Sequence, residues 1–222
     1  MPASPMPPAT AKSEQTRHSD TFVAYVLSLC ENKRVQSDLR TGLGQPVERC
    51  NHLHRYLVRR LPEALHRDAR RAHYAVAALI AARPRPARDA DAERAGNGDP
   101  VPQWHLRPNL GTGLAAAVNA RIIKPGSAEG DLHLFSRQSS DALHGRLPAL
   151  TRHLLTGGIT LDWAVLLEDL SWWNRSRERI ATRWLESYFR TADPSGDGDD
   201  ADNPNSITPP TDDTTDLYEE NN

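Results

Sequence analysis

The chain has 222 residues and a formal net charge of only −2, which conceals two oppositely charged parts. Residues 17–190 contain 26 Lys and Arg against 18 Asp and Glu, whereas residues 191–222 contain ten acidic residues and no basic one. No apolar run approaches the ~18 residues that a membrane span needs. The Pro- and Ala-rich start has no apolar segment of a secretory signal, so we expect a cytoplasmic protein of one or two small domains.

Hydrophobic periodicity predicts an all-α fold, because no stretch alternates with the period of a strand. Residues 1–17 are predicted to be a disordered leader, and residues 18–82 an N-terminal helical half. Within that half, helices are expected over residues 19–32, 46–61 and 63–82, with a turn-rich stretch over residues 34–45. Ser19 or Asp20 is the expected cap of the first helix, and Pro46 suits the first residue of the second.

Residues 83–108 are rich in Pro, Gly and charge, which predicts a long loop or linker. A C-terminal helical half follows over residues 109–190, with helices expected over 109–121, 128–137, 139–156, 162–174 and 175–190. Asp162 is the predicted N-cap of the fourth of these. Residues 191–222 have few apolar side chains and should stay unfolded. The sequence therefore predicts two small helical bundle halves joined by a long loop, with disordered termini.

The sequence shows no pattern of catalytic or metal-binding residues. It has no GxxxxGK[ST] phosphate loop and no HExxH. The two cysteines, Cys30 and Cys50, form no CxxC pair and are expected to be reduced thiols. His52 and His54 are two apart on a predicted helix and therefore face different sides. We expect no enzyme, no metal and no cofactor, although a helical-bundle enzyme of an unfamiliar kind stays an open alternative.

Nearly all of the basic charge is arginine, with 24 Arg and 3 Lys. The guanidinium fork matches phosphate oxygens, although GC-rich coding explains the excess equally well. In the predicted helix over residues 63–82, three arginines share a face opposite the apolar positions. Others follow the last helix and its N-terminal end, where backbone amides also favour anions. The predicted nucleic-acid-binding residues are Lys33, Arg34, Arg67, Arg70, Arg71, Arg137, Arg146, Arg152, Arg175, Arg177, Arg179 and Arg183.

The aromatic residues argue against reading of base edges. Trp163, Trp184 and either Trp172 or Trp173 fall on apolar helical faces, so we expect most of the tryptophans in the core. Charge without interleaved aromatic residues favours contact with the phosphate backbone over base readout. The alternative is an ordinary charged surface with pairs of opposite sign along the helices.

The C-terminal third of the sequence carries a family resemblance. Its most specific part is Leu161-Asp162-Trp163 at the start of a helix, with Trp172-Trp173 ten residues on. In the segments NLGTGLAAAV, LTRHLLTGGITLDWAVLLEDLSWWNRSRERI and RWLESYF, and more loosely in FVAYVLSLCENKRVQSDLRTGLG, the chain resembles the small subunit of the type I-E CRISPR Cascade complex, the CasB family. The resemblance covers roughly residues 20–190, except for 83–108.

The resemblance implies an all-helical, non-catalytic subunit that is present as a pair of copies. It implies packing against the backbone subunits that hold the guide RNA and against the large subunit. It also implies that basic residues hold the target and displaced DNA strands and stabilise the R-loop, among them Lys33, Arg34, Arg137, Arg152 and Arg175 to Arg179. A helical protein–protein adaptor with an ordinary charged surface is the alternative function.

Overall fold

The structure is a computed structural model that describes residues 17–96 and 103–193. The predicted leader, except for its last residue, and all but the first three residues of the predicted acidic tail lie outside these ranges. The described chain is helical throughout and contains no strand, so the predicted all-α fold is confirmed. Its α-helices are α1 (His18–Leu29), α2 (Lys33–Arg40), α3 (His54–Leu57), α4 (Arg67–Ala82), α5 (Arg85–Gly96), α6 (Leu110–Asn119), α7 (Pro125–Arg137), α8 (Ser140–Thr156) and α9 (Trp163–Thr191).

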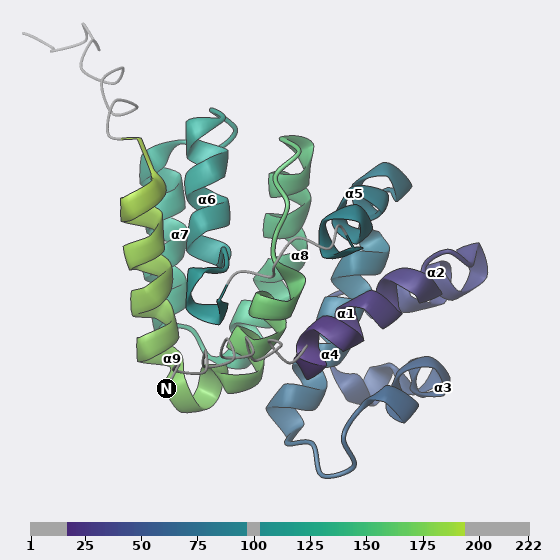
Figure 1. The fold of residues 1–222 in the computed structure, drawn as a ribbon. Helices are drawn as coiled ribbons and strands as arrows, with labels where there is room; N and C mark the ends of the chain where they lie inside the picture. Colours follow the sequence, from purple (N-terminus) through teal and green to yellow (C-terminus); the bar gives the residue numbers. More distant parts are fainter. Residues whose placement is uncertain (1–16, 97–102, 194–222) are drawn as a thin grey trace, which may run out of the picture.

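The long helix α9 is the element on which most of the others pack. Its N-terminal part lies against α1 and α4, and its C-terminal part lies against α6 and α7 (Figure 1). The two parts meet at Ser176, whose φ of −140° and ψ of 27° are not helical. This kink lies at the second residue of the second of the two helices predicted over residues 162–174 and 175–190.

A single hydrophobic core runs through the described helices. It includes Trp163, Trp173 and Trp184, as predicted, and the rings of Trp173 and Trp184 stack with centroids 4.9 Å apart. Cys30 and Cys50 are free and buried in the same core. Buried residues from before and after residues 83–108 contribute to this core.

Three predictions for the N-terminal region are wrong. Residues 33–40, expected in turns, form α2, because the Asn32 side chain accepts hydrogen bonds from the amides of Arg34 and Val35 and so caps a new helix. The helix expected over residues 46–61 is broken into α3 and the 3₁₀ helices Val47–Arg49, Asn51–Leu53 and Val58–Arg60. Neither Ser19 nor Asp20 caps α1, which begins one residue before Ser19.

The predicted loop over residues 83–108 contains α5, so that prediction is wrong over Arg85–Gly96. Two of the prolines that indicated a loop, Pro84 and Pro86, lie at the start of this helix, where a missing N–H costs nothing. The carboxylate of Asp91 faces the core, where it accepts a hydrogen bond from Trp163 Nε1 at 3.0 Å and lies 2.9 Å from Nε of Arg83. These buried contacts fix the segment against α4 and α9.

Asp162 is the N-cap of α9, as predicted, and accepts from the amides of Ala164 and Val165. Its carboxylate also binds Arg107, with Nε and Nη2 each 2.7 Å from an oxygen. The same guanidinium donates to Asp20 of α1 at 2.8 Å. Arg107 therefore links the start of α9 to the start of α1.

Candidate nucleic-acid interface

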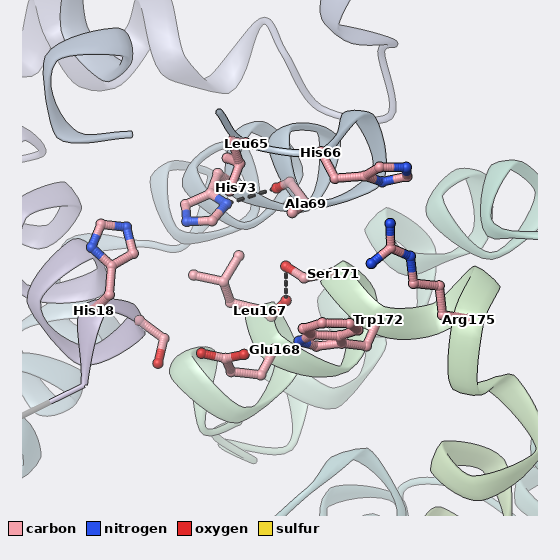
Figure 2. A pocket seen from close by; sticks show the side chains of 11 residues that line it. His18, Leu65, His66, Ala69, His73, Leu167, Glu168, Ser171, Trp172 and Arg175 are labelled. Atoms are coloured by element: carbon pink, nitrogen blue, oxygen red, sulfur yellow. Dashed lines mark hydrogen bonds between the residues drawn. The ribbon is translucent and has the colours of Figure 1, made fainter. Parts of the chain in front are cut away.

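A cavity of about 280 Å³ opens between α1, α4 and the N-terminal part of α9. Figure 2 shows His73 and Ala69 of α4 above it, His18 of α1 at one side, and the α9 residues below. The α9 residues that line it lie on one side of that helix, at the spacing that a helix gives to neighbouring side chains. The full lining is His18, Ser19, Leu65, His66, Ala69, His73, Leu167, Glu168, Ser171, Trp172 and Arg175.

Two buried polar groups in this lining have no partner within the described residues. His73 is 4% exposed and places Nδ1 2.7 Å from the carbonyl oxygen of Ala69. Burial lowers the pKa of His73 to about 4, so the ring is neutral near pH 7. Since a carbonyl only accepts, Nδ1 carries the hydrogen and Nε2 is an acceptor, which is left unpartnered. The hydroxyl of Ser19, a residue 1% exposed, is unpartnered as well.

The lower edge of the cavity carries an exposed aromatic residue and a cation. Trp172 is 47% exposed, in contrast to its neighbour Trp173, which is fully buried. The guanidinium carbon of Arg175 lies 5.6 Å from the centroid of the Trp172 ring, within the range of a cation–π contact. Glu168, half-buried, adds a carboxylate to the same side.

Several predicted basic residues surround this cavity. Arg175 lines it, and Arg177 and Arg179 follow on the exposed side of the kink in α9. Arg67 and Arg70 lie exposed at the N-terminal end of α4, whose capping residue His66 also lines the cavity. No ion pair involving these five arginines is present within the described residues. They are therefore cations that face solvent beside a partly polar cavity.

Five further predicted residues are also exposed but lie on other elements. Arg137 ends α7 next to Gln138, whose carbonyl accepts from Trp173 Nε1 at 3.1 Å, so it lies near α9. Lys33 and Arg34 begin α2, and Arg146 and Arg152 lie along α8. The ten exposed candidates thus do not form one patch, because three separate elements carry the residues away from the cavity.

Arg71 and Arg183 differ from the other ten, since carboxylates already hold them. Arg71 forms an ion pair with Asp141 of α8, and burial lowers the pKa of Arg71. Arg183 pairs with Asp169, a buried residue that also accepts from Trp184 Nε1 at 2.7 Å. Helical phase placed both arginines on an outward face but gave no sign of a partner on α8 for Arg71 or of one across the kink of α9 for Arg183. They are the weakest of the twelve candidates.

The structure also shows basic residues that the sequence reasoning missed. Arg55, Arg59 and Arg60 are exposed around α3, and the guanidinium carbon of Arg60 lies 4.8 Å from the ring centroid of Tyr25. The hydroxyl of Tyr25 donates to the carbonyl of Tyr56 at 2.7 Å, which joins α1 to this segment. The run RYLVRR carried a signal, because in a continuous helix Arg55 and Arg59 would share a face at i, i+4, with Arg60 about 100° from Arg59.

Two other features of the described residues bear on function. No group of three or more His, Cys, Asp or Glu side chains in residues 17–96 and 103–193 is placed to hold a metal ion. No helix in that part of the chain is long and apolar enough to cross a membrane.

The fold and its surface define an all-helical protein with exposed arginines. The family described as CRISPR-associated protein Cse2 matches residues 35–189. The chain is 36% identical to a chain of a "CRISPR RNA-guided surveillance complex", with a TM-score of 0.65, and covers 92% of that chain with 78% of its own length. It is 34% identical to a chain of a "CRISPR RNA-guided surveillance complex, pre-nicking", with a TM-score of 0.66. That similarity covers 78% of this chain and 93% of the other.

A crystal structure of M. ruber CasB is also similar, at 25% identity and a TM-score of 0.64, over 80% of this chain and 95% of that one. No curated protein matches the chain. The chain belongs to the Cse2 family of CRISPR-associated proteins, and the resemblance to CasB is confirmed.

Proposed function

We propose that this chain is the non-catalytic small subunit of a type I-E CRISPR surveillance complex. In that role it holds nucleic-acid backbones without sequence preference and stabilises the R-loop formed by the target and displaced DNA strands. The observation that carries the proposal is the group of exposed cations at the N-terminal end of α4 and the kink of α9. Because no carboxylate of the described residues pairs with them, they are free to contact phosphates.

The energetics of R-loops explain why such cations matter. Exchange of DNA–DNA for RNA–DNA pairs is nearly balanced in free energy, so protein contacts to the strands can decide which state is populated. The strand sequence changes with each guide, which favours contacts to phosphate over contacts to base edges. A rigid helical surface with exposed arginines meets both requirements.

The proposal also includes the partners. The solved complexes that the chain resembles are RNA-guided surveillance complexes. We therefore expect this chain to assemble in the cytoplasm, as a pair of copies, with the backbone subunits that carry the guide RNA and with the large subunit. Two exposed apolar side chains, Leu106 at 67% and Phe189 at 57% exposure, are suited to such protein contacts.

The same apolar side chains favour the alternative, a protein–protein adaptor whose arginines are ordinary surface charge. Salt dependence separates the two functions, because each phosphate contact to a single strand adds about 0.7 to the slope of log K against log salt. An adaptor would bind DNA with a flat salt response or would not bind it.

The decisive experiment compares complexes reconstituted with and without this subunit. R-loop lifetime is measured by displacement of a labelled strand at several salt concentrations. We expect omission to shorten the lifetime, most strongly at low salt, where the phosphate contacts that the subunit adds are strongest. An unchanged lifetime would contradict the proposal, and turnover of a nucleic-acid substrate by the isolated chain would contradict its non-catalytic part.

A further inference from the structure

We infer that the cavity between α1, α4 and α9 binds a single unpaired nucleobase, which stacks at Trp172 and Arg175 and hydrogen-bonds to His73 and Ser19. The inference rests on the proposed function, because a strand must be held at this face before one of its bases can enter. It goes further, since phosphate contacts alone require neither a cavity nor an aromatic residue.

The polar groups inside the cavity point to a ligand with N–H donors. Buried polar atoms are almost always hydrogen-bonded, so two unpartnered ones in the same cavity require an explanation. Nε2 of His73 is an acceptor, and the Ser19 hydroxyl can donate or accept. Glu168 adds a further acceptor on the opposite side. The exocyclic amino group of adenine, cytosine or guanine has two N–H donors and would satisfy up to two of these acceptors.

The shape and lining of the cavity agree with a planar heterocycle. A volume of about 280 Å³ is far more than the space of one water molecule. Leu65, Ala69 and Leu167 supply apolar surface, and the Trp172 ring lies at the edge with Arg175 over it (Figure 2). Unpaired bases are commonly bound by stacking on aromatic rings or on arginine planes.

The charge around the cavity favours a nucleotide over an amino-acid side chain of a partner protein. Two exposed arginines of α4, Arg67 and Arg70, are neighbours in the chain of the lining residues His66 and Ala69. Arg177 and Arg179 are exposed and follow the lining residue Arg175 on α9, so these cations are available to the phosphates of a strand held at this face. A partner's side chain would fill the same space but would leave these cations without a complementary charge. We therefore commit to a nucleobase, and a protein side chain becomes an outcome of the test.

The test compares two oligonucleotides of equal length and charge, an oligo-dA and an oligomer of abasic residues. Binding of the full chain is measured by fluorescence anisotropy at low salt. The unchanged protein should bind oligo-dA more tightly than the abasic oligomer. Trp172→Ala should weaken oligo-dA binding by about 5- to 150-fold, the range for removal of one stacked aromatic ring, and leave abasic binding unchanged. Phe189→Ala, which removes an exposed aromatic residue at the other end of α9, is the matched control.

A second variant separates an effect on binding from an effect on folding. Ser19→Ala removes a buried hydroxyl that has no partner, so its Tm should be no lower than that of the unchanged protein. Its affinity for oligo-dA should nevertheless fall, by about 2- to 10-fold for one hydrogen bond. Trp172→Phe, which keeps an aromatic face, should recover most of the affinity that Trp172→Ala loses.

The outcomes separate the inference from the proposed function. Equal affinity of the unchanged protein for the two oligonucleotides overturns the inference but leaves backbone binding in place. Binding of neither overturns both. If Trp172→Ala impairs assembly with the other subunits but not oligo-dA binding, the cavity receives a protein side chain and the inference is wrong.

Discussion

The two ends of α9 differ in how closely the neighbouring helices pack against them and in how far the buried polar groups there are hydrogen-bonded. At the C-terminal end, α6 lies so close that Gly111 meets the backbone of Trp184. At the N-terminal end, the cavity leaves His73 Nε2 and the Ser19 hydroxyl without partners, and Trp172 half exposed. Nε of Arg183 in the C-terminal part is also buried without a partner, but that part has no room for a Cβ at Gly111, whereas the N-terminal part borders a cavity.

This difference teaches which part of the molecule maintains the fold and which part is open to a ligand. Unpartnered buried polar groups reduce stability, so a fold retains them mainly where they serve binding. On this view, changes at the C-terminal end should alter stability, and changes around the cavity should alter binding. Variants at both ends of α9 and a change of pH test that assignment.

The largest expected effect concerns the close approach of α6 and α9. A Cβ added at Gly111 would overlap the carbonyl of Trp184, and a rigid helix backbone cannot move aside as a flexible side chain can. Gly111→Ala should therefore lower the free energy of unfolding by about 3 kcal/mol or more, at or above the upper end for overpacking. Urea unfolding followed by circular dichroism measures the change.

The matched control is Gly145→Ala on α8, where an added Cβ has no atom within 4 Å. Alanine favours the helix by about 0.5–1 kcal/mol over glycine, so this variant should be slightly stabilised. If both variants change stability by similar amounts, the close approach of α6 and α9 is not what requires glycine at position 111.

The second prediction concerns acid and the buried histidines His73 and His144. Burial lowers the pKa of each to about 4, from an ordinary value near 6.5. Between these values the unfolded chain binds protons that the folded chain does not. Stability should therefore be complete above about pH 6.5 and fall toward pH 4, by up to about 1.4 kcal/mol per pH unit for each histidine.

Urea unfolding at pH 7.5, 6.5, 5.5 and 4.5 measures this dependence. Because carboxylates also titrate at the acid end, the informative quantity is the difference between the unchanged protein and the variants His73→Gln and His144→Gln. Each variant should reduce the slope between pH 6.5 and 4.5. A slope that neither variant changes would show that these rings are not held neutral.

The third prediction concerns binding without a change in stability. Arg177→Glu with Arg179→Glu should shorten R-loop lifetime in the reconstituted complex and reduce the salt slope by about 0.7 for each phosphate that the protein no longer neutralises. Because both side chains are exposed, stability should stay within about 0.5 kcal/mol of that of the unchanged protein.

Lys124→Glu with Arg190→Glu is the control of equal charge at the other end of α9. Arg190 lies 13 residues beyond Arg177, which corresponds to about 20 Å along a helix. This control should have the smaller effect on R-loop lifetime. Equal effects would show that net charge alone, and not the position near the cavity, governs strand holding.

The sequence was sufficient for features that depend on neighbours along the chain. The phase of Arg67 and Arg70 on α4, the cap at Asp162 and the break between the two parts of α9 were all predicted from local spacing. The helix α2 was missed because it is only eight residues long and has two apolar side chains, Val35 and Leu39, which share a face but are too few to establish a period.

Features that depend on distant segments could not be predicted. Arg71 and Arg183 share the helical phase of free surface arginines, and only the fold shows that Asp141 and Asp169 hold them. The cavity was not predicted either, because His73 and Trp172 come from helices almost a hundred residues apart in the chain. Nothing in the spacing of either segment indicates that they meet.

The ion pairs of Arg107 have a consequence for the order of folding during synthesis. Its guanidinium holds Asp20, which is 87 residues earlier, and Asp162, which is 55 residues later. The helix α1 therefore gains this partner only after residue 107 has been made, and the arrangement is complete only after Asp162, the cap of α9, has been made. Contacts of such long sequence separation form late, so we expect α1 to acquire its final position only after residue 162 has been synthesised.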